Sequence, residues 1–186
     1  VSDEIYHGIT YEAPATTVLQ LAPDAIVVNS FSKYFCMTGW RLGWLVLPED
    51  LVHPVTRLAQ NLFISPPTIA QHAALGALAA GPELDARVAR YRRNRDALAT
   101  ALREGGVDRL APAEGAFYLY ADVSRFTDDA VALCRTILEE TGVAITPGVD
   151  FDPPRGHHYV RLSFAGDEPT VAEAGRRLGA WFAARR

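Results

Sequence analysis

The chain has 186 residues, is 49% hydrophobic and 22% charged, and carries a formal net charge of −4 at pH 7. This composition is typical of a globular protein with a sizeable core, and its acidic balance argues against nucleic acid or an anionic membrane as a partner. No apolar run reaches the ~20 residues of a membrane-spanning helix. The two cysteines, Cys36 and Cys134, form no disulfide framework or metal quartet and suit a reducing cytoplasm.

The first half of the chain predicts short strands followed by helices. Residues 1–6 read as the end of a strand already under way, so we expect the later part of a longer protein. Two further strand candidates, residues 25–29 and 40–47, are separated by about ten residues, which is too short for a helical crossover and predicts antiparallel pairing. Proline or glycine punctuates the expected helices that follow, at residues 48–61, at 69–80, and over about twenty residues from Gly81-Pro82 to Gly105.

The pattern changes after Gly106 and predicts a second, smaller α/β or α+β unit of about eighty residues. Its expected strands are residues 117–121, 143–146 and 159–164, and its expected helices are residues 127–140 and 168–184. We place the domain boundary inside the long helix near Arg103, which gives domains of residues 1–103 and 104–186.

Lys33 is the only lysine among the 18 lysine and arginine residues. Arginine evidently serves wherever any positive charge is sufficient, so the one lysine is expected to do something that a guanidinium cannot. A primary amine can lose its proton and attack a carbonyl to form a Schiff base, whereas a guanidinium effectively stays protonated. A surface lysine retained by chance is the alternative, and its neighbours argue against it.

The neighbours of Lys33 are donors suited to a phosphate group. Ser30 and Ser32 supply hydroxyls just beyond an expected strand end, where ligands of α/β sheets bind, and Arg41 supplies a planar charged fork. An amine for an aldehyde, combined with a phosphate site, points to pyridoxal 5′-phosphate.

This cofactor needs a carboxylate beside its pyridine nitrogen, so that the ring can accept electrons. Asp3, at the end of the preceding expected strand, meets that need. Tyr6, three residues later, could donate to the phenolic oxygen of the ring. We therefore expect Asp3 and Tyr6 to complete the cofactor site.

With these motifs the chain resembles the fold-type I aminotransferases of class I/II, the family of aspartate aminotransferase. The matching motifs follow the order of the family along nearly the whole chain: Ser2-Asp3-Glu4-Ile5-Tyr6, Ser30-Phe31-Ser32-Lys33, Gly39-Trp40-Arg41-Leu42-Gly43, Gly115-Ala116-Phe117-Tyr118, Pro147-Gly148 and Tyr159-Val160-Arg161-Leu162-Ser163-Phe164. The lysine segment is the specific part, and the Gly-aromatic and Pro-Gly pieces add little alone.

The resemblance implies an α/β fold, in which the C-terminal part of the large domain, a partial mixed sheet with helices, precedes a smaller α+β domain. It implies pyridoxal phosphate bound to Lys33 as a Schiff base, and no metal. The implied cofactor ligands are Asp3, Tyr6, Ser30, Ser32, Lys33 and Arg41. Arg161 resembles the family's arginine that binds the substrate α-carboxylate. From the residues alone, an arginine within an apolar strand costs free energy unless it is paired or points to water.

The implied activity is transamination between an amino acid and a 2-oxo acid in a homodimer. The family carries about as much chain again before this segment, so the segment alone is expected to be inactive. Two other functions stay open: a lyase or decarboxylase on the same fold, or an aminotransferase-like domain that senses the cofactor within a regulator. Arg161 and the acidic balance favour the enzyme.

Three other candidates are expected to have no role in the site. Cys36 is expected to be an apolar filler, Cys134 a core residue, and His157-His158 part of a turn.

Overall fold

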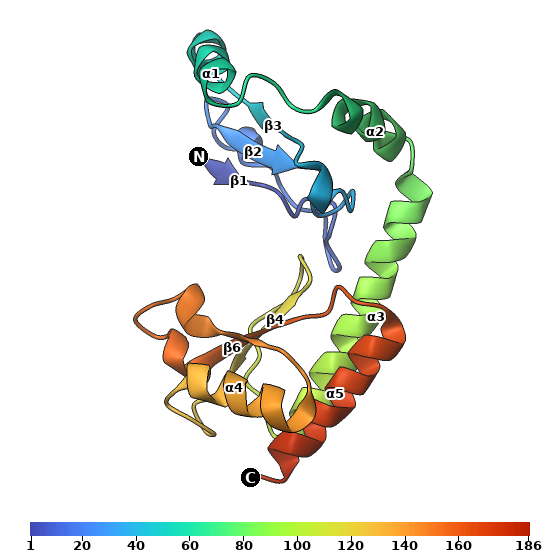
Figure 1. Cartoon of the computed structure of the whole chain (residues 1–186), viewed down its shortest axis with the longest axis vertical. Helices are drawn as coiled ribbons and strands as arrows, with labels where there is room; N and C mark the ends of the chain where they lie inside the picture. Colours follow the sequence, from blue (N-terminus) through green and yellow to red (C-terminus); the bar gives the residue numbers. More distant parts are fainter. The chain divides into compact units, whose positions relative to one another are not determined.

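The computed structural model describes residues 1–186 and divides into two compact units, Val1–Val88 and Ala89–Arg186. The division falls inside the long helix α3 (Gly81–Gly105), drawn in green in Figure 1, whose first turns belong to the first unit and whose remainder belongs to the second. The assignment of residues 1–103 and 104–186 to a large and a small domain of the protein stays a prediction.

The first unit is built around a three-stranded mixed sheet in the order β1 (Ser2–Asp3), β2 (Val27–Ser30) and β3 (Gly43–Val46). β1 and β2 are parallel, and β2 and β3 are antiparallel, as the short connection between them predicts. Because β1 and β2 run in the same direction, their carboxyl ends lie at the same edge of the sheet.

β3 begins three residues later than the sequence pattern predicts. Thr38–Trp40 forms a 3₁₀ helix, and Arg41 then takes a left-handed conformation with φ of 54°. The chain regains extended geometry at Gly43, opposite Ser30. Only glycine fits there, because a Cβ at Gly43 would lie 2.6 Å from the carbonyl oxygen of Asn29.

Two helices follow the sheet, α1 (Glu49–Leu62) and α2 (Thr68–Leu78). Pro48 precedes α1, and the acidic residues in its first turn suit the positive end of the helix dipole. Both helices were predicted within about two residues of their observed bounds. No helix of the chain is both long and apolar enough to cross a membrane.

The second unit pairs an antiparallel sheet with three helical segments. Its strand order is β4 (Tyr118–Asp122), β6 (Tyr159–Ser163) and β5 (Thr146–Pro147). The remainder of α3 belongs to this unit together with α4 (Ala130–Thr141) and α5 (Glu168–Ala183), which Figure 1 draws in yellow-orange and red. β4 and β6 lie within one residue of the predicted strands, and α4 and α5 within three residues of the predicted helices. The strand predicted at residues 143–146 is wrong, because only Thr146 of that segment lies in β5 and residues 143–145 are irregular.

Side chains alternate across β4 and β6 between a buried and a more exposed face. The buried positions form much of the core of the second unit: Leu119, Ala121, Val160 and Leu162. The alternate positions Tyr118, Tyr120 and Arg161 share the other face, because neighbouring side chains of a strand point in opposite directions.

Side-chain caps fix the ends of α4 and α5, and a buried amide joins α3 to the segment after β6. The carboxylate of Asp129 accepts the backbone N–H groups of Val131 and Ala132 at 3.0 Å, and Asp167 caps α5 in the same way. Gly142 ends α4 with a left-handed φ of 71°. Asn94 is 2% exposed, and its Nδ2 donates to two backbone carbonyls that follow β6.

Candidate active site

The edge of the first sheet brings two predicted site residues to neighbouring strand ends. Asp3 is the last residue of β1 and lies opposite Val28 of the parallel strand β2, which ends at Ser30. The Asp3 side chain is exposed, and its Oδ1 accepts the backbone N–H of Ile5 at 3.1 Å. That bond uses one carboxylate oxygen and leaves the other available to a ligand at this edge.

Two serine hydroxyls form a pair just beyond β2. Ser30 Oγ donates to Ser32 Oγ at 2.9 Å and accepts the backbone N–H of Ser32 at 3.0 Å. Ser32 is 8% exposed and Ser30 is half-buried, so the pair is sheltered from bulk water. Ser30 Oγ also lies 3.2 Å from the Leu42 carbonyl oxygen, a second acceptor for its single hydroxyl hydrogen.

Lys33 follows this pair directly and is half-buried. Its Nζ lies 5.8 Å from the centroid of the Tyr6 ring, within the range of a cation–π contact. The structure therefore brings together the predicted amine and the predicted phenol, although Tyr6 comes from the turn after β1. The backbone carbonyl of Lys33 accepts the N–H of Cys36 at 3.1 Å and closes a tight turn.

Arg41 is exposed and is tied to the serine pair through Thr38. A guanidinium nitrogen of Arg41 donates to the carbonyl of Thr38 at 2.7 Å, and the Thr38 hydroxyl donates to the carbonyl of Ser32 at 2.7 Å. Thr38 was not among the predicted site residues, although a hydroxyl between Lys33 and Arg41 is visible in the sequence. It links the two parts of the predicted phosphate site.

Glu4 is a second acidic residue of this turn, and the sequence did not predict a role for it. It is 5% exposed, and its Oε1 accepts the Val18 backbone N–H at 2.8 Å and the hydroxyls of Thr17 at 3.1 Å and Ser2 at 3.4 Å. Its Oε2 lies 3.2 Å from His7 Nδ1. The carboxylate thus fastens the turn that carries Asp3 and Tyr6 to residues 17–18.

The balance of these contacts sets the ionisation of Glu4. Burial alone would raise the pKa of Glu4, but the hydrogen bonds from Val18 and Thr17, the nearby His7 and the Ser2 hydroxyl outweigh it. The pKa therefore lies below its usual value of 4.5. Glu4 is a charged group built into the turn.

Arg161 lies in the central strand of the second unit, on the more exposed face of its sheet. Its guanidinium carbon is 4.3 Å from the Tyr118 ring centroid and 4.0 Å from that of Phe151. Two aromatic faces therefore orient the planar head, which can still present its N–H groups edgewise to a carboxylate. This accounts for the cost of an arginine in a largely buried strand without a neighbouring acid.

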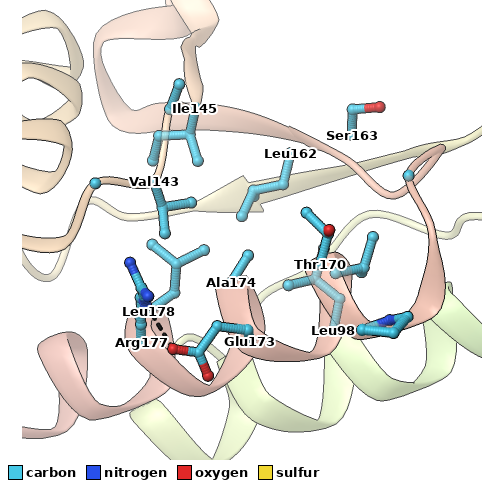
Figure 2. A pocket seen from close by; sticks show the side chains of 15 residues that line it. Leu98, Val143, Ile145, Leu162, Ser163, Thr170, Glu173, Ala174, Arg177 and Leu178 are labelled. Carbon is cyan, nitrogen blue, oxygen red and sulfur yellow. Dashed lines mark hydrogen bonds and ion pairs between the residues drawn. The ribbon is translucent and has the colours of Figure 1, made fainter.

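A pocket of about 590 Å³ in the second unit lies on the opposite face of the same strand (Figure 2). Leu162 lines this pocket together with Val143, Ile145, Ala174 and other apolar residues. Arg161, the neighbour of Leu162 in β6, does not line the pocket. The pocket is therefore separate from the predicted carboxylate-binding arginine.

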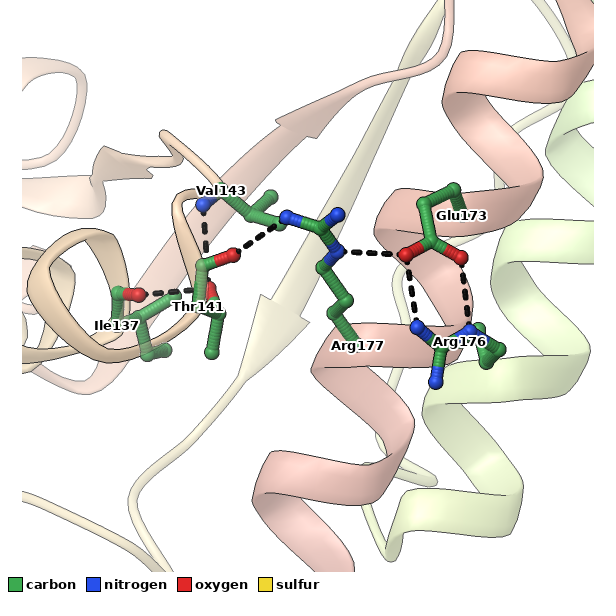
Figure 3. A network of polar contacts seen from close by, with 6 residues as sticks. All are labelled: Ile137, Thr141, Val143, Glu173, Arg176 and Arg177. Atoms are coloured by element: carbon green, nitrogen blue, oxygen red, sulfur yellow. Dashed lines mark hydrogen bonds and ion pairs between the residues drawn. The ribbon is translucent and has the colours of Figure 1, made fainter.

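Polar contacts at one wall of this pocket tie α5 to the end of α4 (Figure 3). Glu173 accepts from Arg176 and Arg177 at 2.7 Å, and these bonds lower the pKa of Glu173 to about 2. Arg177 also donates to the carbonyl of Thr141 at 3.0 Å, while the Thr141 hydroxyl accepts the N–H of Val143. These contacts join structural elements to one another, and we assign them a structural role.

The remaining candidates divide between confirmed and wrong predictions. Cys134 is buried, and burial raises the pKa of its thiol to about 11, as expected for a core residue. Cys36 is exposed with φ of 57°, so its prediction as apolar filler is wrong: the tight turn after Lys33 directs it outward. His157 and His158 lie in a 3₁₀ turn, as predicted. No group of three or more His, Cys, Asp or Glu gathers to hold a metal ion.

Comparison with known proteins identifies the family. The family model "Aminotransferase class I and II" matches residues 1–178. The chain is 52% identical over 185 residues to valine–pyruvate aminotransferase of Mycobacterium tuberculosis, covering 97% of this chain and 48% of that protein. It is 37% identical over 183 residues to aspartate/prephenate aminotransferase of Thermus thermophilus, covering 96% of this chain and 46% of that protein.

Solved structures agree with the sequence comparison. The chain superimposes on the crystal structure of an aminotransferase from Mycobacterium tuberculosis with a TM-score of 0.93 and 51% identity, covering 98% of this chain and 48% of that one. The chain belongs to the class I and II aminotransferases, and it spans about half the length of the curated relatives it matches.

Proposed function

We propose that the protein to which this chain belongs is a pyridoxal-phosphate-dependent aminotransferase, which moves an amino group between an amino acid and a 2-oxo acid. The observation that carries the proposal is the setting of Lys33. The only lysine of the chain follows a sheltered pair of serine hydroxyls at the edge where β1 and β2 end, with the Tyr6 ring beside its amine.

The residues at this edge fit the cofactor. Its phosphate requires several hydrogen-bond donors and a positive charge, which Ser30, Ser32 and Arg41 supply. The hydroxyls of Ser30 and Ser32 and the N–H groups of Arg41 that do not bond Thr38 are the donors that such a phosphate would take up. Asp3, with one carboxylate oxygen unused by Ile5, supports the pairing with a pyridine nitrogen.

When bound, the cofactor supplies an aldehyde that captures amines and a ring that accepts the electrons released at the substrate α-carbon. Lys33 would hold that aldehyde through its amine, and the same amine would act as the base for the proton at the substrate α-carbon. Asp3 would face the ring nitrogen and favour its protonated form, and Tyr6 would donate a hydrogen bond to the ring oxygen.

Arg161 is proposed to bind the α-carboxylate of the substrate. Its position between the Tyr118 and Phe151 rings supports this role, since the rings restrict its rotation and leave the edge of the guanidinium for two parallel hydrogen bonds. The relative from Mycobacterium tuberculosis is named for valine and pyruvate, which supports that pair as first substrates to try. A cytoplasmic homodimer completes the proposal.

The test uses the full-length protein supplied with pyridoxal 5′-phosphate. Amino donors, beginning with valine, are offered with pyruvate, 2-oxoglutarate or oxaloacetate, and the new amino acid is identified by mass spectrometry. Transamination predicts equal amounts of new amino acid and new oxo acid, and no turnover in Lys33→Ala. Products that form equally well without an added oxo acid would instead support a lyase or decarboxylase. Full turnover by Lys33→Ala would end the proposal.

A further inference from the structure

Tyr34, the residue after Lys33, is fixed at both ends of its side chain. Its ring lies against Gly8, where an added Cβ would be 2.8 Å from the ring carbons Cγ and Cδ2. Its hydroxyl donates to Asp85 Oδ1 at 2.7 Å, a short charge-assisted bond. Gly8 follows Tyr6 by two residues, and Asp85 lies in the first turns of α3.

These contacts fix the turn that carries Lys33 from a second side. On the side before Lys33, Ser32 is held by the Ser30 hydroxyl and by Thr38. On the side after it, the Lys33 carbonyl accepts from the N–H and the thiol of Cys36, and the Met37 N–H donates to the carbonyl of Phe31. Tyr34 adds to these local contacts a side-chain hydrogen bond that reaches α3.

Given the proposed function, on which this step rests, we infer that Tyr34 and Asp85 are positioning residues for Lys33. The bond between them holds the turn so that the amine of Lys33 stays over Tyr6 rather than swinging into solvent. The pKa of Tyr34 agrees with this role: the hydrogen bond to Asp85 raises it to about 12, so the phenol remains a donor throughout the working range of pH. A phenylalanine at residue 34 would keep the ring on Gly8 and lose only the tether.

Gly8 holds the ring of Tyr34 independently of the hydrogen bond from the Tyr34 hydroxyl to Asp85. Gly8 has a φ of 92°, and a Cβ there would lie 2.8 Å from two ring carbons of Tyr34, so a larger residue would displace the ring. Contact with Gly8 therefore places the ring, and the bond to Asp85 adds the second constraint. The inference predicts that variants of the hydroxyl and of its acceptor have the same effect.

The test measures covalent capture of the cofactor rather than turnover. Full-length wild-type protein, Tyr34→Phe, Asp85→Ala, Asp85→Asn and the double variant Tyr34→Phe/Asp85→Ala are freed of cofactor. Each is mixed with pyridoxal 5′-phosphate and quenched with borohydride at intervals, and the label at Lys33 is quantified by peptide mapping. Thermal unfolding of each variant serves as the control for overall folding.

The loss of one charge-assisted hydrogen bond predicts a rate of Lys33 labelling about tenfold lower in Tyr34→Phe and in Asp85→Ala. The double variant should be no slower than either single variant, because both remove the same bond. Asp85→Asn should label almost as fast as wild type, since its amide oxygen still accepts the phenol. In turnover assays kcat should fall while KM for the amino donor is unchanged.

Tyr34→Phe that labels at the wild-type rate would overturn the inference, as would additive losses in the double variant. Asp85→Asn as slow as Asp85→Ala would also overturn it, because the charge and not the hydrogen bond would then matter. Wild-type protein with no label at Lys33 would overturn the proposed function as well, which separates that failure from the failure of this step.

Discussion

Replacement of the buried Glu4 should loosen the turn that carries Asp3 and Tyr6 without unfolding the whole protein. Glu4→Ala leaves the N–H of Val18 and the hydroxyl of Thr17 without their acceptor. Each hydrogen bond to a charged group is worth about 1.5–3 kcal/mol, and Glu4 is 5% exposed, so little solvent competes for these donors. We expect local stability to fall by about 3 kcal/mol, since two hydrogen bonds to the charged carboxylate are lost together.

The measurement is amide hydrogen exchange of full-length Glu4→Ala and Glu4→Gln, read by mass spectrometry on peptides that span residues 15–21. A loss of about 3 kcal/mol corresponds to exchange about a hundredfold faster. Glu4→Gln keeps one acceptor oxygen and should lie between Glu4→Ala and wild type. Exchange within about twofold of wild type in Glu4→Ala would refute the reasoning.

A comparison of wild type with Glu4→Gln at different pH values tests whether the charge of Glu4 stabilises the turn. Because the pKa of folded Glu4 lies below 4.5, the ionised carboxylate is favoured by folding. Its stabilisation is therefore fully present above pH 4.5 and is lost as the pH falls through the lowered folded value. The advantage of wild type over Glu4→Gln should shrink on acidification, and an advantage that grew would contradict this account.

Three further changes have distinct expected outcomes. Gly43→Ala places a Cβ 2.6 Å from the Asn29 carbonyl and should destabilise the protein by about 1–3 kcal/mol in thermal unfolding, whereas Gly39→Ala, with nothing within 4 Å, should not; equal midpoints would contradict the close approach. Asn94→Leu leaves the carbonyls of Phe164 and Gly166 without their donor and should lower the free energy of unfolding by about 1–3 kcal/mol. An unchanged free energy of unfolding would show that these carbonyls find other donors. Arg161→Lys should raise KM for amino acids about tenfold or more and leave bound cofactor unchanged; a loss confined to cofactor binding would contradict its role.

Local sequence was sufficient for the lysine segment because its residues lie within one short loop. Ser30, Ser32 and Lys33 are consecutive or nearly so, and the strand before them has the apolar, β-branched pattern of a buried strand. Hydroxyls, an amine and a nearby arginine therefore could be predicted to gather before any long-range contact was known.

Long-range contacts could not be predicted in this way. Glu4 reads as one more acid at a strand end, and only the fold brings Thr17 and Val18 to its carboxylate. The bond from Tyr34 to Asp85 likewise joins residues that are far apart in sequence. Nothing in the pattern around either residue distinguishes a buried acceptor from a solvated one.

Backbone conformation accounts for the errors within the loop itself. The apolar run after Trp40 has the composition of a strand, but Arg41 adopts left-handed geometry and delays the strand to Gly43. Cys36 takes a similar conformation and lies exposed, with its thiol against the carbonyls of its own turn. For residues other than glycine such conformations cost energy and carry no reliable signal in sequence.

The central claim is that the amine of Lys33 holds the aldehyde of pyridoxal 5′-phosphate. The most direct measurement is the mass of the peptides of full-length protein that has been loaded with the cofactor, reduced with borohydride and digested. The account predicts one reduced pyridoxyl phosphate group, attached at Lys33 and absent from Lys33→Arg. A stable adduct located on another residue, or no adduct at saturating cofactor, would contradict it.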